Sequence, residues 1–86
     1  MIDRQIIRAL VDLTIFLEFS DDEVIDPDAA VAATEQLAGA MQMAGIEARV
    51  AFVAGVREIA HEYGAQRRFV EALPEFLGIE TNDDKS

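Results

Sequence analysis

Residues 18–28 read Glu-Phe-Ser-Asp-Asp-Glu-Val-Ile-Asp-Pro-Asp, an acidic stretch that separates two helical patterns. It carries six carboxylates in eleven residues, and no basic residue lies between Arg8 and Arg49. The end of the stretch predicts a helix start, because Asp26 suits the N-cap and Pro27 suits the first helical position. We therefore expect a connector between two helices.

Within this connector, Ser20 and Glu23 have the spacing of a capping box, which predicts one short turn. Val24 and Ile25 are apolar residues between acids, and we expect both to dip into the core and anchor the connector. A calcium loop of the EF-hand type needs a glycine at its sixth position and a glutamate at its twelfth. The stretch offers neither, so an EF-hand is excluded.

Apolar residues recur at spacings of three and four along the chain, which predicts helices. The expected helices cover residues 3–19, 27–44, 47–63 and 65–77. Asp3 should cap the first helix, and Gly45 should close the second. Gly64 predicts a break between the third and fourth. The apolar stripe continues in phase through Val70 and Leu73, so one long, slightly kinked helix over 47–77 is the alternative. Pro74 predicts a bend or an end near Leu73.

One stripe of each predicted helix is apolar and should face the core. The expected core positions are Ile6, Leu10, Leu13 and Leu17, with Ile7, Val11 and Thr14 beside them; Val31, Thr34, Leu37 and Met41; Phe52, Val56, Ile59 and Tyr63, with Val53 and Ala60 beside them; and Val70, Leu73 and Leu77. This pattern predicts an all-α fold, a small antiparallel bundle of three main helices and a shorter fourth helix bent by proline. Residues 1–79 should form one domain, followed by a polar, disordered tail at 80–86.

A chain of 86 residues has a small core. A domain of this size buries only about 60% of its unfolded surface, so its stability is marginal without further support. The chain has no cysteine for disulfide or zinc staples, yet 51% of its residues are apolar. Burial against a second copy would supply the support, and we expect a homodimer.

The end of the first helix, Leu13 to Phe19, is apolar almost all round. A helix of this kind is buried on more than one side. In so small a protein the second side is expected to face another subunit. The predicted dimer seam consists of Leu13, Ile15, Phe16 and Phe19.

The formal net charge of −10 and the pI near 4.2 restrict the classes of partner. Nucleic acid and anionic membranes attract basic patches, so neither is expected to bind. Residues 1–43 carry a net charge of −7 and residues 44–86 carry −3, which makes the first half the more acidic. The start of the sequence has no export-signal pattern. We expect a cytoplasmic protein, and its small size fits a bacterial one.

Helix capping explains Asp26 and Asp28 but leaves the other connector acids without a structural reason. Carboxylates beside an apolar helix end could instead dock a basic partner. The predicted partner-binding residues are Glu18, Phe19, Asp21, Asp22 and Glu23.

Glu58 and His61 form the only Glu-x-x-His pair, the spacing that di-iron carboxylate bundles use. A homodimer would duplicate the pair, with Glu18 or Glu35 as a further ligand. The helical phase opposes this, because the apolar stripe through Val56 and Ile59 turns the pair toward solvent. A metal site is therefore kept only as an alternative, and no cofactor is expected.

Catalytic chemistry has little support in the sequence, which lacks cysteine, has one histidine and has no glycine-rich phosphate loop. The basic pair Arg67-Arg68 is expected to form ion pairs, for instance with Glu62 or Glu71. The sequence predicts a non-catalytic, acidic protein-binding module of the inhibitor, immunity or adaptor type. The alternatives are a homodimeric carboxylate-bridged metalloprotein and a structural subunit of a larger assembly.

Overall fold

The computed structural model describes residues 3–81, and every regular element in this range is helical. The elements in chain order are α1 (Arg4–Phe19), α2 (Pro27–Gln42), α3 (Ile46–Ile59), the 3₁₀ segment η1 (Ala60–Gln66) and α4 (Arg67–Phe76). The prediction of a small all-α bundle is confirmed. Most of the predicted tail, residues 82–86, lies outside the described residues.

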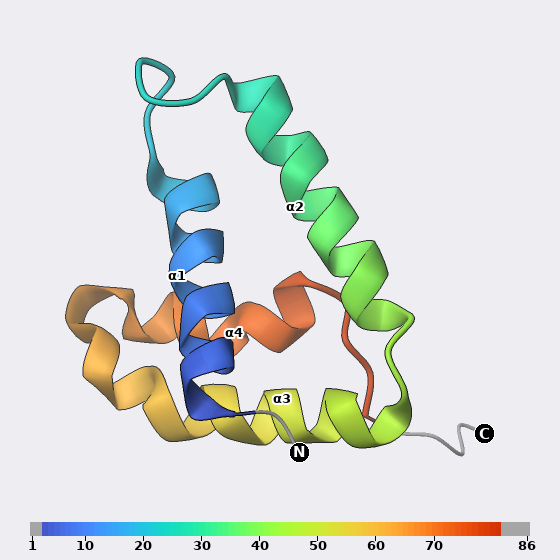
Figure 1. The fold of residues 1–86 in the computed structure, drawn as a ribbon. Helices are drawn as coiled ribbons and strands as arrows, with labels where there is room; N and C mark the ends of the chain where they lie inside the picture. The colour runs from blue at the N-terminus through green and yellow to red at the C-terminus, as the bar shows by residue number, and fades with distance from the viewer. Residues whose placement is uncertain (1–2, 82–86) are drawn as a thin grey trace.

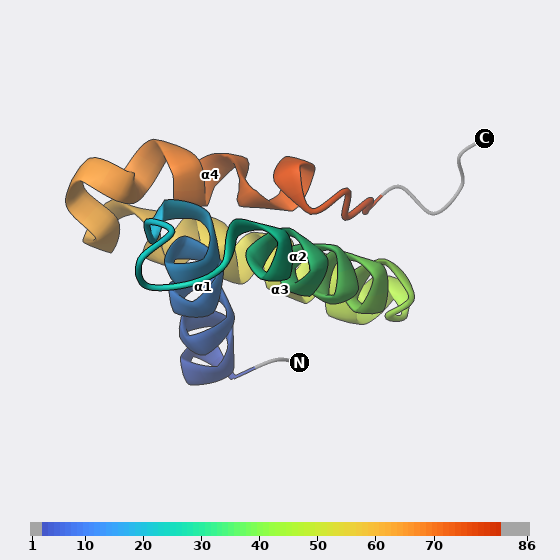
Figure 2. The same ribbon diagram turned by 90° about the horizontal axis from the view of Figure 1, so that it is seen from above.

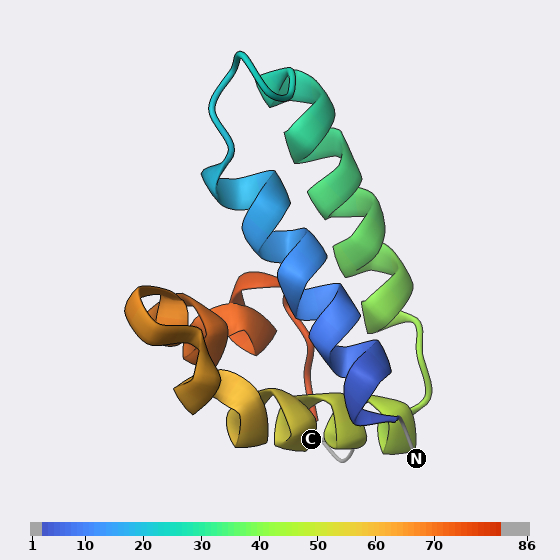
Figure 3. The same ribbon diagram turned by 60° about the vertical axis from the view of Figure 1, so that its left-hand side comes forward.

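The helices α3 and α4, with η1 between them, form one end of the molecule, which we call the base, and α1 and α2 extend away from it (Figure 1). In the base, α3 and α4 run in opposite directions and are joined through η1 (Figure 2). Above them, α1 and α2 run alongside each other in opposite directions, and α1 crosses the α3–α4 pair (Figure 3). The acidic connector joins α1 to α2 at the end farthest from α3 (Figure 1).

Side-chain caps begin the first two helices as predicted. A carboxylate oxygen of Asp3 accepts a hydrogen bond from the backbone N–H of Gln5 at 2.7 Å. Asp26 accepts one from the N–H of Ala29 at 3.0 Å, and Pro27 follows it as the first helical residue. The prediction that Gly45 closes α2 is wrong. Its φ of −62° and ψ of 159° make it the N-cap of α3, and α2 ends earlier, at Gln42.

The two breaker residues of the second half act differently. Gly64 adopts φ 53° and ψ −121° inside η1, which confirms the predicted break between α3 and α4. Pro74 does not end the helix near Leu73, because α4 continues to Phe76. Pro74 has no N–H to donate to the carbonyl of Val70, one turn earlier, and the helix continues past it by two residues.

The end of α4 is a Schellman motif, in which two backbone bonds close the helix around a left-handed glycine. Gly78, at φ 70°, donates its N–H to the carbonyl of Glu75 at 3.0 Å. Ile79 donates to the carbonyl of Pro74 at 2.9 Å, and both of these residues are buried. The chain after α4 therefore folds back onto the core.

The main core cluster comes from α1, α3, η1, α4 and the turn after α4. Its buried members are Ile7, Val11, Phe52, Val53, Val56, Ile59, Ala60, Val70, Leu73, Leu77 and Ile79. The stripes predicted for the third and fourth helices are thus confirmed. No residue of α2 belongs to the buried cluster.

The stripe predicted for the first helix is confirmed in most positions. Ile7, Val11, Thr14 and Leu17 are buried and Leu10 packs against the core, whereas Ile6 and Leu13 are exposed. On α3, Gly55 faces Ile7, and a Cβ at Gly55 would clash with the Cδ1 of Ile7. The glycine therefore permits the close approach of α1 and α3 at Ile7.

The stripe predicted for the second helix is only partly correct. Leu37 and Met41 pack against the core but remain partly exposed, and Val31 is 57% exposed. The only buried residue of α2 is Ala30. The face of α2 that carries Val31 therefore has no covering helix among residues 3–81.

A polar seam fastens the outer side of α1 to the end of α3 and to η1. Its contacts join Arg4 to Glu58 at 2.8 Å, Arg8 to Glu62, and the Tyr63 hydroxyl, as donor, to Asp12 at 2.8 Å. The three α1 residues lie four positions apart and so share one face of the helix.

Two pKa values reflect this seam. Burial, and then the hydrogen bond to Asp12, raise the pKa of Tyr63 from 10.0 to about 12. The hydrogen bond from Arg8 lowers the pKa of the Glu62 carboxyl, since it stabilises the charged form.

Candidate functional site

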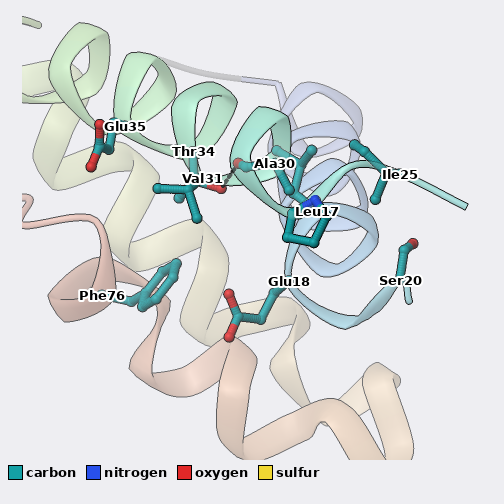
Figure 4. Close-up of a pocket in the computed structure, with 10 residues that line it drawn as sticks. Leu17, Glu18, Ser20, Ile25, Ala30, Val31, Thr34, Glu35 and Phe76 are labelled. Carbon is teal, nitrogen blue, oxygen red and sulfur yellow. Dashed lines mark hydrogen bonds between the residues drawn. The ribbon is translucent and has the colours of Figure 1, made fainter. Parts of the chain in front are cut away.

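A groove opens between the end of α1, the connector, the first half of α2 and the end of α4 (Figure 4). Its volume is about 450 Å³, within the range of about 300–1,000 Å³ that is typical of ligand pockets. We call it the apical groove. Its apolar lining consists of Leu17, Ile25, Pro27, Ala30, Val31 and Phe76.

Two carboxylates are the charged groups of the apical groove. Glu18 comes from α1 and Glu35 from α2, and Figure 4 shows them on different sides of Val31. The other polar groups are the hydroxyls of Ser20 and Thr34. The Thr34 hydroxyl donates a hydrogen bond to the backbone carbonyl of Ala30, with 2.9 Å between the two oxygens. The groove is therefore apolar along its walls and negatively charged at its edges.

Phe76 packs on the ring of Phe69, which in turn packs on Phe19. Its ring centroid lies 5.5 Å from that of Phe69, which lies 5.1 Å from that of Phe19. Both pairs are edge-to-face, the arrangement that aromatic quadrupoles favour. This aromatic row links α4 to the end of α1 and fixes the wall that Phe76 gives to the groove.

The connector contains the predicted turn, but Asp21 rather than Ser20 is its capping residue. The carboxylate of Asp21 accepts hydrogen bonds from the N–H groups of Glu23 at 3.1 Å and Val24 at 3.2 Å. The predicted anchoring is half correct. Ile25 is partly buried and lines the apical groove, whereas Val24 is 63% exposed because the turn directs it outward.

The predicted partner-binding residues separate in space. Glu18 lines the apical groove, and Phe19 packs on Phe69 in the aromatic row. Asp21 has a structural role as the cap of the turn. Asp22 and Glu23 are exposed and do not line the groove.

Of the ten residues that line the groove, only Glu18 was predicted as a binding residue. Among the other nine, Val31 was assigned to the core, Glu35 was considered only as a metal ligand, and Phe76 was given no binding role. The spacing of Pro27, Val31 and Glu35 along one side of α2 was a usable signal for this wall. Phe76 had no such signal, because it reaches the groove only through the packing of α4.

The predicted dimer seam is largely accessible in the single chain. Leu13, Phe16 and Phe19 are each about half exposed, whereas Ile15 packs against the core. Ile6, in the first turn of α1, is exposed as well.

The alternative metal pair does not form part of a larger cluster. Glu58 is engaged by Arg4 in an ion pair, and His61 is exposed on η1. In the described range, 3–81, no three residues of the types His, Cys, Asp and Glu come together as metal ligands.

A second hollow, of about 500 Å³, lies at the start of α3 and is lined by Ile46, Glu47, Val50 and Ala51. It is formed by one helix and has one charged residue, so it offers less shape and charge than the apical groove. Elsewhere on the surface, Arg67 pairs with Glu71 at 2.9 Å, one of the pairings expected for the basic pair.

None of the helices in the described part of the chain is both long enough and apolar enough to cross a membrane. Comparison of the chain with known protein families, curated proteins and solved structures gave no match.

Proposed function

We propose that this protein is a non-catalytic, acidic protein-binding module of the inhibitor, immunity or adaptor type, which docks a basic partner at the apical groove. The observation that supports this most is the combination of an apolar lining with carboxylates on two walls, Glu18 and Glu35. Apolar walls supply binding free energy, and the carboxylates favour partners of opposite charge.

The charge distribution of the whole chain supports the same proposal. The first half has a net charge of −7 and contains both the connector and α2. A concentrated negative field accelerates the encounter with a basic surface. Salt screens this field, so the association rate should fall as the salt concentration increases. The exposed acids of the connector, Asp22 and Glu23, would contribute to this steering without contacting the partner directly.

The groove lining supports binding more than catalysis. It includes two hydroxyls and two carboxylates but no histidine or cysteine, and the Thr34 hydroxyl is already bonded to the backbone.

The proposed function can be tested by site-specific photo-crosslinking in the host cell. A photoreactive residue at position 31, in the groove, should capture a basic protein. The same residue at position 43, which is 86% exposed and outside the groove, should not. Glu18→Gln together with Glu35→Gln should reduce capture from position 31. Capture of an acidic protein, or equal capture from both positions, would contradict the proposal.

We also propose self-association as a separate property of α1. The exposed side chains of Leu13 and Phe16 would form the seam, and sedimentation at micromolar concentration tests it. A monomer that persists as the concentration rises would remove the seam without affecting the groove.

A further inference from the structure

The wall that α2 contributes to the apical groove has the length of two helical turns. Its lining residues begin at Pro27 and end at Glu35, with Ala30, Val31 and Thr34 between them. Eight steps of about 1.5 Å give a wall of about 12 Å. A second helix lying along this wall would present side chains at i, i+3 or i+4, and i+7.

Other common modes of peptide recognition fit the groove less well. Addition of a β-strand requires an exposed sheet edge, and residues 3–81 contain no strand. Proline-rich peptides bind between several exposed aromatic rings, whereas Phe76 is the one aromatic residue in the lining. A helix in a groove requires only an apolar trough and a few anchor sites, which the apical groove has.

We propose that the occupant of the apical groove is an amphipathic basic helix of another protein. Its apolar stripe would lie between Val31 and Phe76, and lysine or arginine residues on the two flanks would pair with Glu18 and Glu35. This inference rests on the proposed function and names the chemistry of the partner. The position of a carboxylate on each of two walls is what requires basic residues on both flanks.

The volume of the groove matches such anchors. At about 450 Å³ the groove has room for several apolar side chains. The walls are largely built before binding, since the aromatic row fixes Phe76 and the Thr34 hydroxyl is satisfied by the backbone. A pre-formed site loses less entropy when it binds.

A second copy of this chain is a poor occupant for electrostatic reasons. Each copy has a net charge of −10, so a second copy has few basic residues to pair with Glu18 and Glu35 in the groove. The arginines that could offset this are largely engaged: Arg4, Arg8 and Arg67 form ion pairs within the chain, and Arg49 donates to the carbonyl of Glu80. The helix that fits the groove is therefore expected from a basic protein.

The test uses three synthetic peptides of about 16 residues, a length at which an isolated helix is marginally stable. The basic helix has leucines at i, i+4 and i+7 with lysines on both flanks. A second peptide keeps the leucines and lysines but has a proline in place of one central residue, which prevents the helix. A third has glutamate in place of each lysine. Binding of each labelled peptide is followed by fluorescence anisotropy.

Two groove variants and two matched controls accompany the peptides. Val31→Asp adds a charge to the apolar trough, and Glu18→Gln with Glu35→Gln removes both carboxylates. The matched controls are Met43→Asp, and Glu47→Gln with Glu80→Gln, which change the net charge equally outside the groove. Circular dichroism establishes that each variant is folded. All substituted side chains are exposed, so we expect the fold to persist.

We expect the basic helix to bind about tenfold or more tightly than the other two peptides, and more weakly as salt increases. Val31→Asp and the double glutamine variant should each weaken binding about tenfold, while the controls leave it unchanged. Equal binding of the proline peptide, with the same dependence on Glu18 and Glu35, would overturn the helix but leave the proposed function standing.

Two other outcomes would contradict the helix proposal, and the first of them would also contradict the proposed function. Failure of both basic peptides to bind, or binding that ignores Glu18 and Glu35, would contradict the helix and the proposed function together. A wild-type dimer that dissociates on Val31→Asp would assign the groove to a second copy and overturn the helix proposal.

Discussion

The base of the molecule and α2 use their apolar residues in different ways. In the base, the stripes of α3 and α4 close on α1, and Val56 and Leu73 have no exposed surface. In α2, which is equally helical, the only buried residue is Ala30, and Val31 is more than half exposed. The two regions therefore differ in packing and not in secondary structure.

This difference teaches how a chain of 86 residues can combine stability with a binding surface. A small core leaves little apolar surface to spare, yet the apolar face at the start of α2 is not needed to close the base. Stability comes from the base, where side chains interlock, and α2 keeps an apolar face open toward the apical groove. Binding surfaces are commonly drawn from the less stable parts of a fold.

The largest expected effect comes from truncating the core. Leu73→Ala removes a fully buried side chain from the base and should lower the free energy of unfolding by about 2–5 kcal/mol. Val31→Ala on α2 should lower it by no more than about 0.5 kcal/mol, because the side chain is exposed. Urea unfolding followed by circular dichroism measures both. Equal losses would mean that α2 is part of the core after all.

A matched pair of glycines should give changes of opposite sign. Gly39→Ala on α2 meets no atom within 4 Å and should stabilise the protein by about 0.5–1 kcal/mol, since alanine favours a helix. Gly55→Ala on α3 would place its Cβ against Ile7 in the core, and overpacking of this kind costs about 1–3 kcal/mol. Offset by the helix preference, the net loss should be about 1 kcal/mol.

Thermal or urea unfolding of both glycine variants provides the measurement. A stabilised Gly55→Ala protein would show that α1 has room to move away from α3. A destabilised Gly39→Ala protein would show that α2 is packed more closely than the described contacts indicate.

The smallest expected effect concerns the polar seam of the base and appears at high pH. Tyr63 is the only tyrosine, so the absorbance of its tyrosinate form reports one site, with an expected pKa of about 12. Because the folded state holds this proton more tightly than the unfolded state, the stabilisation is complete below pH 10 and is lost as pH rises toward 12.

Asp12→Asn separates the two causes of this shift. Burial is the larger cause and remains in the variant, so the pKa of Tyr63 should fall only part of the way toward 10.0. A wild-type pKa at the ordinary value of 10.0 would mean that the tyrosine hydroxyl is exposed and does not contact Asp12.

The sequence predicted the helices better than it predicted their partners. Asp3, Asp26-Pro27 and Gly64 determine local structure by local chemistry, and each acts as expected. On α1 only Ile6 and Leu13 were wrongly assigned to the core, because periodicity alone does not contain the interhelical contact between Gly55 and Ile7 that centres the buried face. The role predicted for Gly45 was also wrong, since glycine can serve at either end of a helix, and here it begins α3.

The candidate site was predicted only in part, for a similar reason. The acidity of the connector pointed to the end of the molecule where the groove lies, and Glu18 was named from it. The groove itself requires Phe76 to lie beside α2, more than forty residues away in the sequence. Such a contact follows from tertiary packing, so the local pattern around Phe76 carries no sign of it.

The central claim, that the base holds the fold together while the first half of α2 contributes little to the core, is tested most directly by native-state hydrogen exchange. Amides of α3 and α4 should exchange only through global unfolding, whereas amides in the first half of α2 should exchange through smaller openings with a lower free energy. Amides of α2 that are protected to the full free energy of unfolding would contradict the account.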